Sequence, residues 1–242
     1  MDAFCLYICF FNPKKKQKMK YPGDFSSWTT QLVHDAFGFQ DAETLPSLTE
    51  WMDMPIELNR HDTERIEEII AYSKRRVAFW SEGDIKLKLL GPMLLVANVD
   101  NPTFSTFSEM TVKCQVKTIQ NKLINVLGRP DLIVAKGEFE PTLPYFCMQE
   151  YKPKQKTNDP RGQTLIALVA AHQLNLEAGY RFPVLYGAFN IGRDWTFLTL
   201  EGNRYALSRG YFLDNQTDFE HIVRRFRALK AIIYKLLDNF PP

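Results

Sequence analysis

The spacing of the hydrophobic positions predicts two consecutive helices in the first half of the chain. Residues 63–80 and 81–95 both place apolar side chains three or four positions apart, which is the repeat of one helix face. Thr63 is positioned to cap the first of these helices. Ser81 and Asp84 match a capping box, so the second helix should begin at Ser81. Pro92 should kink or end that helix, because proline has no backbone N–H to donate.

From residue 103 onward the pattern changes to short apolar runs that are typical of β-strands. Residues 104–116 and 119–126 should pair as a hairpin, and two further strands are expected at 132–135 and 145–151. A turn-rich segment with Gly137, Pro141 and Pro144 separates the last two. This pattern of short apolar runs therefore indicates a sheet that follows the helical part of the chain.

A long helix should follow this first group of strands. Asp159 is a good N-cap, Pro160 is a good first helical residue, and Gly179 should end the helix. Strands are then expected at 184–191, 195–200 and 204–207, and a final amphipathic helix at 217–237, with Arg224, Arg225, Arg227 and Lys235 on its solvent-exposed face. The order of helix, strands, helix, strands, helix predicts a mixed α/β fold, with a central mixed sheet flanked by helices.

We expect residues 80–242 to form one α/β domain, with residues 21–79 as an N-terminal helical addition. Residues 1–20 place an apolar run before a group of lysines, which is the reverse of the order in a secretory signal. They fit either a disordered segment or a start codon read upstream of the true one at Met19.

Composition narrows the class of protein further. Hydrophobic residues make up 45% and charged residues 24%, as in ordinary globular proteins, and no apolar run approaches the length of a membrane span. The 4 cysteines show neither zinc-ligand spacing nor a disulfide framework. We therefore expect a cytoplasmic protein without a membrane partner. The net charge of +2 is too small to indicate nucleic-acid binding by itself.

Three polar segments carry the candidate chemistry. Gly128-Arg129-Pro130-Asp131 precedes one apolar strand, Glu150-Tyr151-Lys152 ends another, and Gln163 lies in the first turn of the following helix. Alternate residues of a strand point to the same face, so the side chains of Glu150 and Lys152 should lie side by side.

A carboxylate beside an ammonium at a strand end suits the hydrolysis of a phosphodiester. Glu150, together with Asp131 from the neighbouring strand, can hold Mg²⁺ through oxygen, and Mn²⁺ is an alternative. Lys152 can orient or deprotonate the attacking water, or stabilise charge that develops on the phosphate.

The order of Pro130-Asp131 followed nineteen residues later by Glu150-x-Lys152 resembles the PD-(D/E)xK nuclease superfamily. This resemblance implies a restriction-endonuclease-like core of order α-β-β-β-α-β, a divalent metal, and DNA as substrate. The segment 80–86 is similar to uncharacterised bacterial members found often in the Bacteroidetes.

The same resemblance assigns two accessory residues. Some branches place a glutamate on the helix before the sheet, which makes Glu82 a third candidate metal ligand. The recombination-nuclease branch places a glutamine on the following helix in a Q-x-x-x-Y pattern; Gln163 fits the glutamine, while Ala167 stands in place of the tyrosine.

Each of these residues also has a purely structural interpretation. Asp131 could simply begin a strand after a proline turn, and Glu150 with Lys152 could be a solvent-exposed pair on an edge strand, where such pairs contribute little. Glu82 is explained by the helix dipole alone, and Gln163 could be a solvated helix residue.

The sequence thus predicts a Mg²⁺-dependent nuclease that acts on nucleic acid, most simply DNA. A homodimer is compatible with this function. Lys154, Lys156 and Arg161 form a local basic segment that could contact the phosphate backbone. The alternatives are a catalytically inactive interaction or nucleic-acid-binding module with the same fold, and a hydrolase of another phosphate ester.

Overall fold

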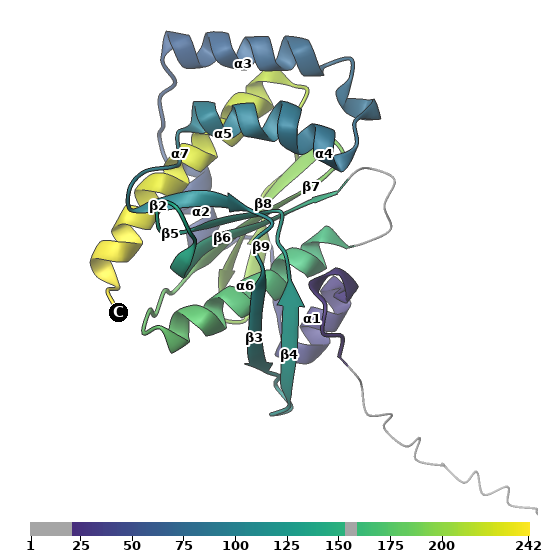
Figure 1. The fold of residues 1–242 in the computed structure, drawn as a ribbon, viewed down its shortest axis with the longest axis vertical. Helices are drawn as coiled ribbons and strands as arrows, with labels where there is room; N and C mark the ends of the chain where they lie inside the picture. Colours follow the sequence, from purple (N-terminus) through teal and green to yellow (C-terminus); the bar gives the residue numbers. More distant parts are fainter. Residues whose placement is uncertain (1–20, 153–158) are drawn as a thin grey trace, which may run out of the picture.

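The computed structural model describes residues 21–152 and 159–242 (Figure 1). The α-helices are α1 (Thr30–Phe37), α2 (Pro46–Asp53), α3 (Arg60–Ser73), α4 (Glu82–Ile85), α5 (Gly91–Ala97), α6 (Pro160–Glu177) and α7 (Gln216–Asn239). The strands are β1 (Gln40–Ala42), β2 (Phe104–Ser108), β3 (Val112–Lys117), β4 (Leu123–Gly128), β5 (Leu132–Lys136), β6 (Thr142–Lys152), β7 (Leu185–Ile191), β8 (Asp194–Glu201), β9 (Arg204–Leu207) and β10 (Tyr211–Phe212). Two 3-10 turns, η1 (Phe25–Ser27) and η2 (Val77–Phe79), and a π-helical segment, η3 (Lys86–Leu90), complete the described elements.

The main sheet is mixed and has the strand order β1-β9-β8-β7-β6-β5-β2, with β10 paired to β8. Strands β6 and β7 run parallel, as do β1 and β9, while the other neighbours are antiparallel. Helix α6 makes the crossover between the parallel strands β6 and β7. The predicted mixed α/β fold with a C-terminal helix is therefore confirmed.

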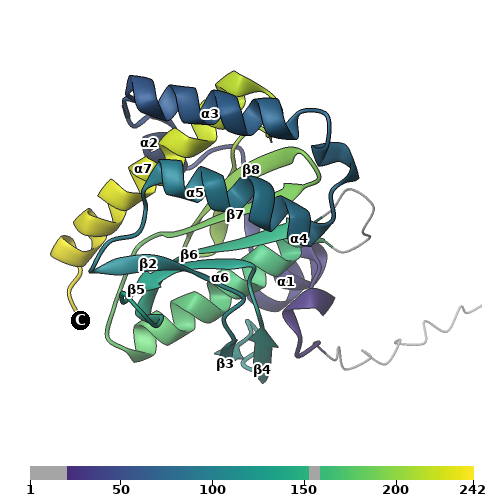
Figure 2. The ribbon, with the colours of Figure 1, turned by 45° about the horizontal axis from the view of Figure 1, so that its top comes forward.

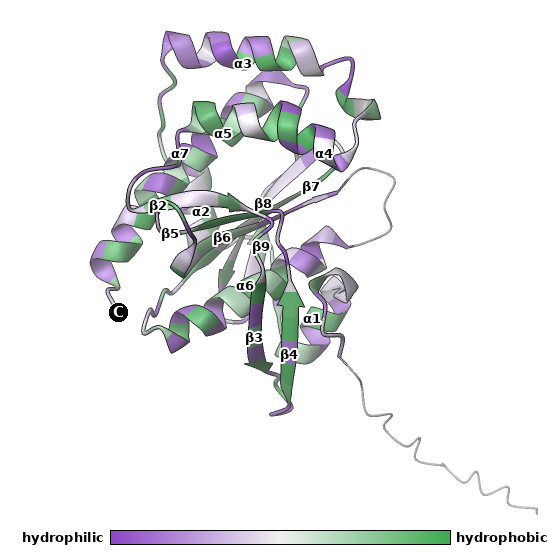
Figure 3. Cartoon of the chain, viewed as in Figure 1, coloured by the Kyte–Doolittle hydropathy of each residue, from purple (hydrophilic) through white to green (hydrophobic). Residues whose placement is uncertain are grey.

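Helices cover both faces of this sheet (Figures 1 and 2). The alternation along β5 shows why: Leu132 and Val134 enter one apolar cluster with α5 and α7, while Ile133 and Ala135 enter a second cluster with α6 and α1. Both sides of the strand are buried, so its sequence is an uninterrupted apolar run. The outer helix α3 is largely hydrophilic, as Figure 3 shows.

The first two helices differ from the prediction at their boundaries. Helix α3 begins at Arg60, because Asn59 and Asp62 form the capping box, and it ends at Ser73 rather than near Trp80. The capping box at Ser81 is confirmed.

Pro92 does not end the helix that follows Ser81. The helical path continues through η3 and α5 to Ala97, and Pro92 lies in the first turn of α5. The π-helical segment widens the turn just before Pro92, which accommodates the missing N–H.

The predicted pairing of residues 104–116 with 119–126 is only partly right. Strand β2 pairs with β5 at the edge of the main sheet, and β3 pairs with β4 in a separate two-stranded hairpin. Glu109 explains the difference, because its φ of 53° turns the chain out of the sheet after β2. The spacing of apolar residues gives no indication of such a left-handed conformation at a non-glycine residue.

The start of α6 is docked closely on α1. Asp159 caps α6 as predicted, and its carboxylate accepts hydrogen bonds from the N–H of Gly162 and from the N–H of Thr30. A Cβ on Gly162 would lie 2.5 Å from backbone atoms of Thr29 and Thr30, so only glycine permits this approach. The contact fixes the helix that carries Gln163.

Arg225 corrects the expected solvent-exposed face of α7. Its side chain is buried, and its guanidinium donates to the backbone carbonyls of Trp51, Met52 and Met54 at the end of α2. These carbonyls lack partners within their own helix, and Arg225 satisfies them. None of the helices in the described residues is long and apolar enough to cross a membrane.

Candidate active site

One cavity brings together five of the predicted site residues. It measures about 310 Å³ and is lined by residues from the end of β6, from α4 and from the start of α6. Its lining consists of Asp24, Phe25, Ser26, Glu82, Lys86, Glu109, Leu127, Gly128, Arg129, Asp131, Glu150, Lys152 and Gln163. Segments far apart in the sequence therefore meet at the point where the candidate motif predicted a site.

Glu150 and Lys152 lie on a central strand, so the edge-strand interpretation is wrong. Strand β6 is flanked by β5 and β7, and both side chains are only 11% exposed. Lys152 Nζ lies 2.5 Å from Glu150 Oε1, and Tyr151 points to the opposite face, into the apolar core. A buried ion pair of this kind is costly to desolvate, in contrast to a surface pair.

Asp131 is held by hydrogen bonds to the backbone at the end of β6. Its N–H donates to the Gln149 carbonyl over 3.0 Å, and its Oδ2 accepts from the Tyr151 N–H over 2.6 Å. The carboxylate thus takes the place of a backbone acceptor beside β6. This contact places Asp131 next to Glu150, and it gives Asp131 a partner that a simple turn residue would lack.

Gly128 lets the chain pass close to η1 just before Asp131. A Cβ at this position would lie 2.1 Å from Cδ2 of Phe25, which is itself buried. The glycine of the Gly128-Arg129-Pro130-Asp131 string is therefore required for packing, and it sets the path of the chain into the site.

Lys86 is a site residue that the motif search missed. From the start of η3 its Nζ lies 2.5 Å from Asp131 Oδ1, 2.9 Å from Glu109 Oε1 and 3.1 Å from Glu82 Oε1. Its pairing with Glu82 at the i,i+4 spacing was the one available sequence signal. The Lys86 side chain is 23% exposed, whereas that of Glu109 is 61% exposed and lies at the rim.

The two acids at the centre resist ionisation. Burial, reinforced by the charge of Asp131, raises the pKa of Glu150 to about 7. Burial also raises the pKa of Asp131, although hydrogen bonds from Lys86 and Tyr151 act in the opposite direction. Two neighbouring buried carboxylates create a demand for positive charge.

The two lysines remain ammonium ions in this environment. Burial alone would lower the pKa of Lys86, but hydrogen bonds to Asp131 and Glu109 outweigh it, and the pKa is raised. The same balance raises the pKa of Lys152, through its hydrogen bond to Glu150. Lys152 is therefore placed to donate protons or stabilise negative charge rather than to accept a proton.

Gln163 is buried, so its interpretation as a solvated helix residue is wrong. Its side chain lines the cavity, the residue is 3% exposed, and its Nε2 has no hydrogen-bond partner within the described part of the chain. A buried amide donor without a partner is rare and calls for an explanation. Its amide can therefore donate a hydrogen bond to an acceptor oxygen in the cavity.

The predicted basic segment is not part of this cavity as far as the structure describes it. Arg161 lies outside the lining and forms an ion pair with Asp41, with 3.5 Å between Nη1 and Oδ2. Lys154 and Lys156 lie outside the described residues.

The donor set fits Mg²⁺ as a site of few protein ligands. Mg²⁺ is a hard cation that binds one or two carboxylates and keeps several waters, and Asp131 with Glu150 supplies such oxygens. Across residues 21–152 and 159–242, no group of three or more His, Cys, Asp or Glu residues has the geometry of a ready-made metal site. Glu82 contacts Lys86 instead, so its role as a third ligand stays a prediction.

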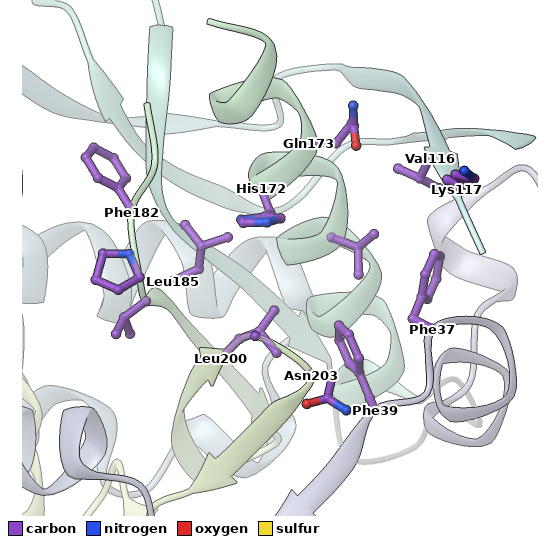
Figure 4. A pocket seen from close by; sticks show the side chains of 14 residues that line it. Phe37, Phe39, Val116, Lys117, His172, Gln173, Phe182, Leu185, Leu200 and Asn203 are labelled. Carbon is purple, nitrogen blue, oxygen red and sulfur yellow. The ribbon is translucent and has the colours of Figure 1, made fainter. Parts of the chain in front are cut away.

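A second cavity of about 220 Å³, shown in Figure 4, shares no lining residue with the first. Phe37, Phe39 and Leu200 make it largely apolar, and His172 and Asn203 add polar groups. No carboxylate is found among the described residues that line it, so it offers no comparable ligands for a hard cation.

No protein-family model matches this chain, and no curated protein matches it.

Proposed function

We propose that this chain is a Mg²⁺-dependent nuclease of the PD-(D/E)xK type that hydrolyses phosphodiester bonds in DNA. The observation that carries the proposal is the buried group of Asp131, Glu150 and Lys152 at the end of β6, beside the unpartnered amide of Gln163. A structural ion pair would not need a second buried carboxylate with a raised pKa next to it.

The strand order supports this type of nuclease. With the β3–β4 hairpin set aside, the chain runs from α4 and α5 through β2, β5 and β6 to α6 and β7. That is the α-β-β-β-α-β order that the resemblance implies. Asp131 directly precedes β5, and Glu150 lies on the neighbouring strand β6.

Each residue has a role that its surroundings support. Asp131 and Glu150 would hold Mg²⁺, which on binding would polarise the phosphoryl group and acidify a bound water. Lys152, held as an ammonium by Glu150, stabilises charge on the phosphate and orients the attacking water. Gln163 donates its free N–H to a phosphate oxygen.

Mn²⁺ titration calorimetry tests the proposal on the full chain. Wild type should bind Mn²⁺ saturably, and the Asp131→Asn/Glu150→Gln variant should not; a matched Glu43→Gln/Asp238→Asn variant removes two exposed carboxylates and should bind as wild type does. Mg²⁺-dependent cleavage of DNA by wild type, absent in Lys152→Met, would complete the assignment. Cleavage retained in the double variant would refute it.

A non-catalytic nucleic-acid-binding module is the second candidate, and one observation favours it. Asp131 and Glu150 already have ammonium partners within 2.5 Å, so lysines could neutralise the site permanently. Failure of wild type to bind Mn²⁺, even with oligonucleotide present, would favour this function.

A further inference from the structure

The β3–β4 hairpin carries a concentration of positive charge next to the acidic cavity. Between Glu109 and Asp131 the sequence has four basic residues and no acidic one. These residues are Lys113, Lys117, Lys122 and Arg129. This segment alone carries a charge of +4, which exceeds the net charge of +2 of the whole chain.

The two faces of the hairpin differ in character. The inner face is apolar and packs on α6, with Val116, Ile124 and Val126 in the same buried cluster as the helix. The outer face is exposed along its whole length, and it consists of Lys113, Gln115 and Lys117 on β3 and Leu123, Asn125 and Leu127 on β4. The strand register sets Gln115 directly opposite Asn125, so two amides lie at the centre of this face.

The base of the hairpin forms part of the wall of the active-site cavity. Leu127, Gly128 and Arg129 line the cavity together with Asp131, while the hairpin extends away from the main sheet (Figures 1 and 2). A polymer that follows the outer face toward its base therefore arrives at the carboxylates.

We propose that this outer face binds double-stranded DNA, with the hairpin lying in the major groove. The proposal rests on the nuclease function above and names its substrate class. Lys113, Lys117 and Arg129 contact phosphates, and the amides of Gln115 and Asn125 face the base edges.

Shape and charge both favour this partner. The major groove of B-form DNA admits a two-stranded β-ribbon and presents donor and acceptor patterns that asparagine and glutamine side chains read. The major groove of A-form RNA is deep and too narrow for such a ribbon. An exposed face with cations, amides and leucines and without carboxylates complements a polyanion that also exposes thymine methyl groups.

Binding measured without cleavage tests the proposal separately from catalysis. The probe is a fluorescent 20-base-pair DNA duplex in EDTA, titrated with full-length protein over a salt series from 50 to 200 mM. In Lys113→Gln/Lys117→Gln the slope of log K against log salt should become shallower by about 1.8, since each phosphate contact contributes about 0.9. Over this fourfold change in salt, wild-type affinity should fall about tenfold more than that of the variant.

Matched variants separate the contact from a general charge effect. Arg65→Gln/Lys136→Gln removes two exposed cations from α3 and from the end of β5 remote from Asp131, and should leave the slope unchanged. Gln115→Ala/Asn125→Ala should reduce discrimination between duplex sequences without changing the slope.

Three results would overturn the proposal: no binding of duplex DNA by wild type, an unchanged slope in the lysine variant, or equal or tighter binding of duplex RNA or single strands. Cleavage of DNA by a protein whose hairpin variants bind normally would leave the nuclease assignment standing without this surface. DNA binding that depends on the hairpin, by a protein that takes up no Mn²⁺, would leave the binding surface standing without the nuclease assignment.

Discussion

Replacement of Lys86 by glutamine should destabilise the metal-free protein and strengthen metal binding. The change removes the ammonium that contacts Asp131, Glu109 and Glu82, and it leaves a neutral polar side chain that is one bond shorter. Asp131 then keeps its hydrogen bond from the Tyr151 N–H but loses its ionic partner.

The size of the stability loss follows from the burial of the pair. Breaking a fully buried ion pair costs about 3–5 kcal/mol, because it leaves a charge uncompensated. Lys86 is 23% exposed, so water can partly replace it, and about 2–3 kcal/mol is expected. For a chain of this size each kcal/mol lowers Tm by about 2–4 °C, which gives a decrease of about 4–12 °C.

The effect on metal binding has the opposite sign. The Lys86 ammonium contacts the same Asp131 carboxylate that we assign to the metal, so the two cations compete for it. Its removal should tighten Mn²⁺ binding on the order of tenfold, or about 1.4 kcal/mol. Because a ligand stabilises the folded state according to its affinity, saturating Mn²⁺ should raise the Tm of the variant more than that of wild type.

Thermal unfolding with and without Mn²⁺, together with calorimetry, measures both effects. Lys88→Gln is the matched control: Lys88 lies two residues away, pairs with Asp84 over 2.5 Å, and does not line the cavity. It should leave Mn²⁺ affinity unchanged. Lys86→Arg should keep the wild-type affinity within a few-fold, since it keeps the charge. The competition argument is refuted if Lys86→Gln binds Mn²⁺ no more tightly than wild type.

Two further predictions concern the acid at the centre and the packing beside it. The pKa of Glu150 is raised to about 7 from an ordinary 4.5, so the folded state holds this proton more tightly than the unfolded chain does. The free energy of unfolding of the metal-free protein should therefore fall by up to about 3 kcal/mol as pH rises from about 4.5 to about 7. Urea unfolding at several pH values should show this slope in wild type and lose it in Glu150→Gln. Gly128→Ala forces a methyl group against Phe25 and should cost about 1–3 kcal/mol in unfolding free energy, whereas Gly210→Ala, which meets open space, should cost little; equal losses would contradict this account.

Part of the candidate site could be predicted from the sequence because it depends on local order. Glu150 and Lys152 share a face through strand alternation alone, and Asp159 with Pro160 fixes the start of the helix that carries Gln163. The position of Asp131 beside them follows once its apolar run is recognised as the neighbouring strand. The roles of Glu82 and Gln163 came from the family resemblance and not from local order.

The missed features all depend on contacts between distant segments or on unusual backbone conformations. Lys86 reaches Asp131 across 45 positions of sequence, and its periodicity alone marks it as a surface residue of a helix. Arg225 looked solvent-exposed because the carbonyls that it satisfies belong to α2, more than 170 residues earlier. Apolar periodicity assigned β2 to the wrong partner, since the turn depends on the positive φ of Glu109.

The charges of the site and of the hairpin suggest different roles for the two in binding a phosphate. Three carboxylates (Asp131, Glu150 and Glu82) surround two ammonium ions (Lys86 and Lys152), which leaves the centre of the cavity negative when all are ionised. Such a centre repels a phosphate, whereas the outer face of the hairpin attracts one. In the proposed mechanism, a divalent cation held by Asp131 and Glu150 would make the centre of the cavity positive and so favour entry of a phosphate, whereas the hairpin would hold a duplex without metal.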